Sequence, residues 1–391
     1  MRNGFLKSKR VCLVGVGETD QGKIPGKSSL QFHSEAAKLA IEDAGIKKED
    51  INGVVTAFSF VDQTFMHCTT FSEYFGLAPK FNYTSMAIGG STAAWMVAQA
   101  AQAIHAGLAD VILCVRGDNT LTGLTSEGMV ALIKEMSHIE LEYPYGLLTP
   151  GGYGLFAQRH MYEFGTTSEQ LAAIAVAMRK HAALTPNAYM KKPITIEDVV
   201  NGPVIASPLH LLDCCLVTDG GGAFIVASEE KAKNMRKKPV YLKGVAQDST
   251  HQYIGQAPGI REVLSTYRKA ADKAFDMAGI TREDIDVAEI YDCFTITVLM
   301  SLEGLGFCEI GEGGPFVENG NIELGGKLPV NTHGGLLSQA HLGGMFHVNE
   351  AVRQLRGEAG ERQVPDAEHA VVTGNGGLFS SQSVLILGNQ P

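Results

Sequence analysis

The chain has 391 residues, of which 45% are hydrophobic, and a formal net charge of −10. That length suits two domains of ordinary size, and no apolar run is long enough to cross a bilayer. The acidic balance and the scattered basic residues argue against nucleic acid or a membrane as a partner. Seven cysteines without a C-x-x-C pair, and a polar, basic start instead of a signal peptide, favour a cytoplasmic protein with reduced thiols.

The first third of the chain alternates strand-like and helix-like patterns. In chain order, we expect a strand at 11–17, a helix at 28–44, a strand at 53–57, a helix at 91–106 and a strand at 110–115. Gly45 stands where a helix C-cap glycine belongs. Helix 91–106 is apolar on nearly every side, which predicts that it lies between two layers of the fold.

A sequence repeat links the two halves of the chain. Residues 36–51 and 270–285 match at nine of sixteen positions in one register. The second half then repeats the order of elements, with a strand at 240–245, a helix at 261–278, a strand at 286–291, a helix at 345–356 and a strand at 370–373. This pattern predicts an internal duplication. The alternation of strands and helices in both halves predicts α/β units with mainly parallel sheets.

An insertion of about a hundred residues separates strand 110–115 from a strand expected at 222–227, and the second half lacks it. The insertion holds a helix that opens with Thr167 and Gln170, a capping-box pair, and runs to about residue 183. Insertions on a rigid scaffold often carry substrate contacts. Four basic residues are therefore candidates for contact with a polyphosphate, with a solvated helix end as the alternative for each: Arg179, Lys180, Lys191 and Lys192.

The segment from 331 to 357 has the strongest character of a functional site. It carries His333, His341, His347 and two Gly-Gly pairs, and helix 345–356 follows. Glycine loops let backbone N–H groups approach a ligand closely, and a helix N-terminus favours negative charge. The alternative is a tight turn with incidental histidines, although three histidines beside glycine pairs favour a site.

Five motifs in chain order resemble those of the thiolase superfamily, above all the sterol-carrier-protein-type thiolases and their thiolase-like relatives. The motifs are NYTSMAIGGST at 82–92, where that family has its nucleophile loop, DGGGA at 219–223, EIYDCF at 289–294, N-x-x-G-G followed by a histidine at 331–341, and GNGG at 374–377. Each motif is short, but together they cover essentially the whole chain in the family's order.

This resemblance implies the α/β thiolase fold, with two duplicated βαβαβαββ halves in a layered α/β/α/β/α arrangement and a loop-domain insertion in the first half. We place the halves at 1–238 and 239–391 and the insertion at about 118–215. The resemblance also implies a homodimer, an acyl-CoA thioester as substrate without a tightly bound cofactor, and a small zinc-ribbon/OB-fold partner subunit. No His, Cys or Asp spacing predicts a metal site in this chain.

The chain departs from the thiolase pattern at the two positions that carry the family's catalytic cysteines. A thiolase carries its acyl group on a cysteine because a thiolate is both a good nucleophile and a good leaving group. The second cysteine position is Gly374, and a hydroxyl nucleophile at Ser85 would need an activating base. The nucleophile loop here has no cysteine and reads Ser85, Met86, Ala87, Ile88 and Gly89. The sequence therefore argues against an acyl-enzyme.

The chain does keep residues that could stabilise a thioester enolate and transfer protons. The family histidine that contacts the thioester oxygen corresponds to His341, and Tyr291 stands where sterol-type thiolases have a histidine. A tyrosine hydroxyl can pass a proton to or from a β-hydroxyl beside an imidazole. His333 is either a second acid/base or is only hydrogen-bonded to backbone. Donors that stabilise the enolate are expected at Gly89, Gly90, Gly376, Gly377 and Asn331.

A tyrosine and a histidine without a cysteine resemble the aldolase-type members of this group, which cleave β-hydroxyacyl-CoA side chains without an acyl-enzyme. Those members tend to carry tyrosine at the position of His341, so the reaction type stays open at this point. The leading hypothesis is an aldolase that degrades a bulky steroid or aromatic acyl-CoA. The alternatives are a true thiolase, which is an acyl-CoA:CoA acyltransferase working with a small partner subunit, and a non-catalytic scaffold.

Overall fold

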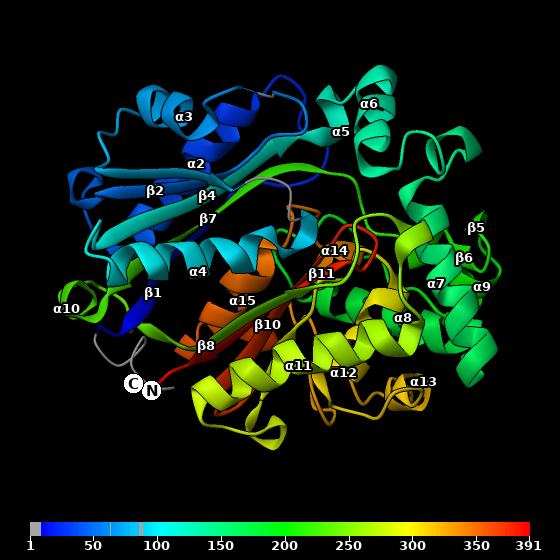
Figure 1. Cartoon of the computed structure of the whole chain (residues 1–391). Coiled ribbons are helices and arrows are strands. Elements are labelled where there is room, and N and C mark those ends of the chain that lie inside the picture. Colours follow the sequence, from blue (N-terminus) through cyan, green and yellow to red (C-terminus); the bar gives the residue numbers. More distant parts are fainter. Residues whose placement is uncertain (1–8, 63, 86–88) are drawn as a thin grey trace.

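The computed structural model of the chain describes residues 9–62, 64–85 and 89–391 (Figure 1). Its strands are β1 (Val11–Glu18), β2 (Gly53–Ala57), β3 (Phe81–Ser85), β4 (Val111–Asn119), β5 (Val204–Ala206), β6 (Leu209–His210), β7 (Asp219–Ser228), β8 (Val240–Ser249), β9 (Val287–Glu289), β10 (His369–Gly376) and β11 (Ser381–Gly388). Within these described residues, nine strands form one mixed sheet in the order β3-β2-β4-β7-β1-β8-β11-β10-β9, and β5 pairs with β6.

The helices of the described residues are α2 (Ser29–Ala44), α3 (His67–Phe75), α4 (Thr92–His105), α5 (Thr120–Gly123), α6 (Ser126–Met136), α7 (Thr149–Phe164), α8 (Ser168–Ala183), α9 (Ile196–Val200), α10 (Glu229–Ala232), α11 (Ile260–Ala278), α12 (Thr295–Leu305), α13 (Gly313–Phe316), α14 (Gly335–Ser338) and α15 (Met345–Arg356). Local sequence explains where they begin and end. α2 begins at a capping box of Ser28 and Gln31 and ends at Gly45, which adopts the left-handed conformation. α8 begins at the predicted capping box of Thr167 and Gln170.

The strand order shows the internal duplication. In the first half, β1 lies next to β7, followed by β4 and β2, and in the second half β8 lies next to β11, followed by β10 and β9. The two series meet where β1 pairs with β8, with Cys12 opposite Tyr241 and Leu13 opposite Val240. The helices that carry the repeated sequence cover equivalent strands, because α2 packs on β1 and β7 while α11 packs on β8 and β11. The predicted duplicated fold is confirmed.

Alternating side chains put helices on both faces of the sheet. In the first half, Cys12 and Val14 pack against α2, whereas Leu13 packs toward α4 and α15. In the second half, Val371 packs toward α11 and α12, whereas Val372 packs toward α4 and α15. The sheet therefore wraps around α4 and α15, with α2 and α3 outside one part and α11 and α12 outside the other (Figure 1). This is the predicted α/β/α/β/α layering, and α4 is central, as its apolar surface predicts.

The expectation of mainly parallel sheets is wrong. Within the nine-stranded sheet of the described residues, five of the eight neighbouring pairs run antiparallel, including β7 with β1 and β11 with β8. Strands that are buried on both faces read as apolar runs, so their sequence pattern does not encode their direction. The predicted strand ends also shift. β4 extends to Asn119, and β9 ends at Glu289, so Tyr291 stands beyond the strand.

The segment between β4 and β7 docks against the second half of the chain. Phe156 of α7 and Ile174 and Met178 of α8 share one core with α11 and α12. α8 also packs against α14, which belongs to the histidine-containing segment. The limits of the two halves and of the insertion stay predictions. No helix in the described part of the chain has the length and apolar character to cross a membrane.

Candidate active site

Tyr291 and His341 lie side by side, although 50 residues separate them in the chain. The hydroxyl oxygen of Tyr291 is 3.1 Å from Nε2 of His341. Tyr291 is buried, whereas His341 keeps some exposure. Both backbones are held in place. The side-chain amide of Asn331 forms two hydrogen bonds with the main chain of Ile290, at 2.6 and 2.7 Å, and the His341 N–H donates to the Thr218 hydroxyl.

The first glycine loop (Gly89 and Gly90) and the second glycine loop (Gly376 and Gly377) meet at this pair. A Cβ at Gly90 would overlap the Tyr291 ring, and a Cβ at Gly89 would lie only 2.9 Å from Cα of Gly376. Only glycine allows backbones to approach so closely. α4 begins just after the first glycine loop, and a Cβ at Gly344, which caps α15, would lie 3.4 Å from the Tyr291 ring. Two helix N-termini therefore face the pair and favour negative charge there.

Burial sets the resting protonation of both groups. It raises the pKa of Tyr291 well above the ordinary value, and neighbouring Cys293 and Cys215 add to the rise. Burial lowers the pKa of His341 to about 3, and the positive charge of Arg116 acts in the same direction. At neutral pH the pair is therefore a neutral phenol, which can donate a proton, and a neutral imidazole, which can accept one.

The seven cysteines, all within the described residues, lack the environment of a nucleophile. Burial is the largest cause of a raised pKa for each thiol: Cys12, Cys68, Cys114, Cys214, Cys215, Cys293 and Cys308. A reactive cysteine needs a lowered pKa. Ser85 is buried, and its hydroxyl has no hydrogen-bond partner in the described chain, so no base activates it there. The rest of the predicted nucleophile loop, Met86 to Ile88, lies outside the described residues.

The structure does not bring His333 to the Tyr291–His341 pair. Nδ1 of His333 is 2.9 Å from a carboxylate oxygen of Glu289. Burial alone lowers the pKa of His333, but the charge of Glu289 outweighs burial, and the pKa is raised. His347 packs edge-on against His333, with ring centroids 4.8 Å apart. His333 therefore pairs with a buried carboxylate and not with backbone, and its role as a second acid/base stays a prediction.

Asp292, which follows Tyr291 in the chain, lies with the buried group formed by Glu289, His333 and His347. Its carboxylate accepts hydrogen bonds from the N–H groups of Leu336 and Leu337, at 2.8 and 3.2 Å. The same carboxylate lies 3.1 Å from Nε2 of His347. Asp292 therefore fixes the start of α14 and the ring of His347.

The four basic residues considered for polyphosphate contact differ in their surroundings. Arg179 is buried, and its guanidinium donates to the Ser338 hydroxyl at 2.9 Å. This bond ties the insertion to the histidine-containing segment. The other three are exposed: Lys180, Lys191 and Lys192. Lys180 pairs with Glu323 at 2.7 Å. Contact of these residues with CoA stays a prediction.

Two residues near the pair are missing from the sequence-based candidates. Tyr153 of α7 places its hydroxyl 2.9 Å from both Oδ1 of Asn375 and the carbonyl oxygen of Gly377, so the insertion supports the second glycine loop. Arg116 of β4 is buried, and a Cβ at Gly343 would overlap its Nη1. A charged residue directly after the apolar run 111–115 is the sequence signal that points to Arg116. No local pattern points to Tyr153, because its partners lie more than 200 residues away.

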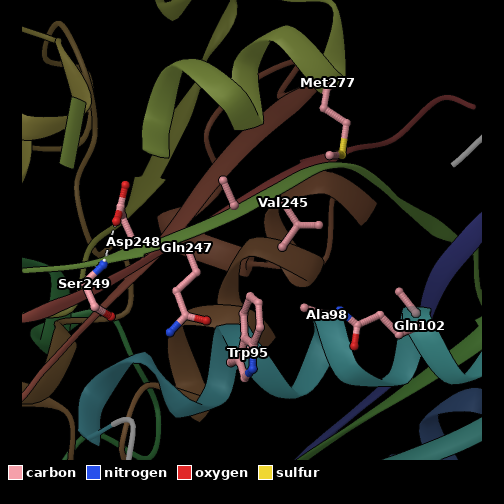
Figure 2. A pocket seen from close by; sticks show the side chains of 10 residues that line it. Trp95, Ala98, Gln102, Val245, Gln247, Asp248, Ser249 and Met277 are labelled. Carbon is pink, nitrogen blue, oxygen red and sulfur yellow. Dashed lines mark hydrogen bonds between the residues drawn. The ribbon is translucent and has the colours of Figure 1, made fainter. Parts of the chain in front are cut away.

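A hollow of about 580 Å³ lies between α4 and β8 (Figure 2). Its lining includes Trp95 and Gln102 of α4, Gln247 of β8 and Met277 of α11. None of the candidate catalytic residues lines this hollow. In the described ranges, no group of three or more His, Cys, Asp or Glu side chains is arranged to hold a metal ion.

Comparison with known proteins defines the class to which the chain belongs. Residues 246–389 match the thiolase C-terminal domain-like family. The chain is 36% identical to the 17-hydroxy-3-oxo-4-pregnene-20-carboxyl-CoA lyase of Mycobacterium tuberculosis, over 97% of this chain and 100% of that protein. The chain therefore belongs to the thiolase superfamily and is a thiolase-like enzyme of acyl-CoA chemistry.

Two further relatives place the chain near aldolases within that superfamily. It is 37% identical to the steroid side-chain-cleaving aldolase of Thermomonospora curvata, over 95% of this chain and 97% of that protein. The structure of the Ltp2-ChsH2(DUF35) aldolase matches with a TM-score of 0.86 and 37% identity, over 97% of each chain. The predicted resemblance to aldolase-type, thiolase-like proteins is confirmed.

Proposed function

We propose that this chain is a lyase that splits the Cα–Cβ bond of a β-hydroxyacyl-CoA by retro-aldol chemistry. One observation carries the proposal: the Tyr291 hydroxyl and Nε2 of His341 lie 3.1 Å apart beside two glycine loops, while the pKa of every thiol in the chain is raised. The substrate proposed is a bulky acyl-CoA of the steroid kind, because the relatives named above include a steroid side-chain-cleaving aldolase. An aromatic acyl-CoA is the second substrate class.

The reaction needs a base for the β-hydroxyl and a way to hold charge on the thioester oxygen. The β-hydroxyl gives its proton to Oη of Tyr291, while Tyr291 passes its own proton to Nε2 of His341. The Cα–Cβ bond then breaks, so that the β-carbon leaves as a ketone or aldehyde and the electron pair moves into the thioester as an enolate. The imidazolium returns the proton to Cα by way of Tyr291, which yields the shortened acyl-CoA and restores the neutral pair.

The glycine loops and the helix N-termini supply the enolate stabilisation in this proposal. Removal of one preorganised donor to a developing oxyanion costs about 2.7–4 kcal/mol, so backbone N–H groups aimed at the enolate oxygen would lower the barrier substantially. Asn331 acts indirectly, because its amide is engaged by the main chain just before Tyr291. His333 stays a candidate acid/base only if substrate binding moves it away from Glu289, since the two groups are paired in the structure.

The proposal extends to the assembly and to CoA. We infer a homodimer and a small zinc-ribbon/OB-fold partner subunit that helps to bind the acyl-CoA. The structure of the related aldolase, which includes ChsH2(DUF35), supports the second inference. CoA enters as part of the substrate, with no tightly bound cofactor, and the exposed lysines Lys180, Lys191 and Lys192, with Arg179, are the candidates for its phosphates. The protein is proposed to work in the cytoplasm.

Product analysis tests the proposal. The protein, alone and together with a DUF35-type subunit, is incubated with a β-hydroxyacyl-CoA and separately with a β-ketoacyl-CoA plus free CoA. A carbonyl product released without consumption of CoA supports the lyase. An acyl-CoA that forms only when CoA is added supports a true thiolase instead. Equal activity of the wild type and a Tyr291→Phe, His341→Ala double variant supports a scaffold.

A further inference from the structure

Asn375 lies between the second glycine loop and the segment that carries Tyr291. It immediately precedes Gly376 at the end of β10 and is only 2% exposed. Its amide nitrogen Nδ2 donates to the carbonyl oxygen of Tyr291 at 3.3 Å. The Thr297 hydroxyl reaches the same oxygen at 3.2 Å, but its single proton has a closer acceptor in the carbonyl oxygen of Phe294, at 2.6 Å. The amide of Asn375 is therefore the main side-chain donor to the Tyr291 carbonyl among the described residues.

The main chain of Asn375 reaches the first glycine loop as well. A Cβ at Gly90 would overlap both the carbonyl oxygen of Asn375 and the ring of Tyr291. Asn375 thus adjoins both glycine loops and also holds the backbone of the proposed acid/base. The spacing of these groups matters for the reaction, because proton transfer and enolate stabilisation must take place around one substrate.

Tyr153 of α7 holds the side chain of Asn375 from the insertion. Its hydroxyl oxygen lies 2.9 Å from Oδ1 of Asn375 and 2.9 Å from the carbonyl oxygen of Gly377. Burial raises the pKa of Tyr153 well above its ordinary value, so the phenol keeps its proton and acts as a donor. A donor at Oδ1 fixes the amide of Asn375 in the orientation that turns Nδ2 toward Tyr291.

The ring of Tyr153 contacts the segment that carries Tyr291. It stacks on Phe294, three residues further along that segment, with ring centroids 4.6 Å apart. α7 also packs on the second glycine loop, because a Cβ at Gly152 would overlap the side chain of Leu378, which follows the loop. One buried side chain of the insertion therefore lies between the glycine loop on one side and the acid/base segment on the other.

We propose that Tyr153 is a positioning residue, which acts through the side chain of Asn375 to fix Tyr291 relative to the second glycine loop. This inference rests on the retro-aldol function proposed above. The acceptors of the Tyr153 hydroxyl both belong to the protein, so its effect on the reaction is indirect. Phenylalanine at this position would keep the stacking on Phe294 and lose only the hydroxyl, which leaves the amide of Asn375 free to turn away from the Tyr291 carbonyl.

A hydroxyl that serves only the stability of the fold predicts a different result. Loss of a buried donor destabilises a protein wherever the donor lies, so lower stability alone does not show positioning. Positioning lowers kcat for each folded molecule and leaves KM close to that of the wild type, because substrate still binds while the reacting groups are misplaced. Tyr267→Phe is the control, since Tyr267 is also buried and belongs to the same hydrophobic core as Tyr153.

The test is a double-mutant cycle on the full-length protein with its DUF35-type subunit, with a β-hydroxyacyl-CoA as substrate and release of the carbonyl product as the assay. In Tyr153→Phe, we expect kcat to fall by about 10–100-fold, with KM near the wild-type value, while Tyr267→Phe keeps wild-type kinetics. Asn375→Ala should lower kcat by a similar factor. Because the two side chains act in series, the double variant should be no slower than the slower single variant.

Two outcomes overturn the inference. One is an unchanged kcat, per folded molecule, in Tyr153→Phe or in Asn375→Ala, which tests the same connection if Tyr153→Phe does not fold. The other is a pair of losses that multiply in the double variant, as independent effects do.

A structural measurement separates this inference from the proposed function. If the wild type shows no lyase activity, the proposed function fails, and crystal structures of the wild type and Tyr153→Phe then decide the role of Tyr153. Displacement of the Tyr291 hydroxyl from Nε2 of His341, 3.1 Å away in the wild type, supports positioning. The same distance in both proteins, with the Asn375 amide unturned, contradicts it.

Discussion

His341 and His333 belong to the same glycine-rich segment and are eight residues apart, but their neighbours give them opposite protonation. Burial acts to lower the pKa of both rings. Beside the cation of Arg116, the pKa of His341 falls to about 3, whereas beside the carboxylate of Glu289 the pKa of His333 is raised. The comparison teaches that the sign of the nearest fixed charge, and not burial alone, separates a proton acceptor from a structural ion pair.

The largest effect on activity is expected at Tyr291, which contacts His341. Tyr291→Phe removes the hydroxyl that relays the proton, so kcat should fall by about 10²–10⁴-fold, while thermal unfolding stays close to that of the wild type. Tyr267→Phe is the matched control, because Tyr267 is also buried and belongs to the same hydrophobic core as Tyr291. Retention of activity in Tyr291→Phe would rule out the proposed relay.

The next largest effect on activity is expected at Gly90, whose backbone packs against the ring of Tyr291. In Gly90→Ala the new methyl group overlaps the Tyr291 ring, so the ring must move, and we expect a loss of about 10²-fold in kcat/KM. Gly151→Ala is the control, since its Cβ would meet only Leu147 at an ordinary 3.6 Å. Equal kinetics for the two alanine variants would contradict the close packing at the first glycine loop.

His333, by contrast, should affect the stability of the fold and not the activity. His333→Gln leaves the buried carboxylate of Glu289 without its partner, and we expect a loss of about 3–5 kcal/mol in the free energy of unfolding by urea. Activity per folded molecule should stay close to that of the wild type. The double variant His333→Gln, Glu289→Gln should recover most of the stability, because no uncompensated charge remains. A large fall in kcat at unchanged stability would instead make His333 a catalytic residue.

His333 and His341 should also have opposite effects on how stability changes with pH. The pKa of His333 is raised, so its contribution is complete below about pH 6.5 and is lost as the pH rises through its folded pKa. The pKa of His341 is lowered, so its contribution is complete above about pH 6.5 and is lost as the pH falls. Urea unfolding between pH 4.5 and 9 should therefore show a weaker alkaline decline in His333→Gln and a weaker acidic decline in His341→Gln. Equal slopes in both variants would contradict the assigned protonation states.

The smallest effect is expected at the protein surface. Lys180 pairs with Glu323 at an exposed position, so Lys180→Ala should change the free energy of unfolding by less than about 0.5 kcal/mol. If Lys180 contacts a phosphate of CoA, KM should rise in a salt-dependent manner while kcat stays the same. An unchanged KM at low salt removes this lysine from the CoA site.

The comparison of the two histidines also shows what the sequence could and could not predict. Helix 345–356 was predictable to the residue, because its periodicity lies between glycines that end the pattern on either side. The meeting of Tyr291 and His341 followed from resemblance to a family. By contrast, the pairing of His333 with Glu289 and the position of Arg116 beside the turn after His341 depend on the tertiary fold, which brings in side chains from β9 and β4. No local pattern records which charge lies beside which imidazole, nor the direction of a strand that is buried on both faces.

The central claim is that the carbon–carbon bond is cleaved without any acyl group attached to the protein. The most direct test is a single-turnover reaction with a β-hydroxyacyl-CoA labelled in its acyl portion, followed by intact-protein mass spectrometry and product analysis. The account predicts a ketone or aldehyde and a shortened acyl-CoA in the absence of free CoA, with unmodified protein throughout. A labelled cysteine on the chain, or product that forms only when free CoA is added, would contradict it.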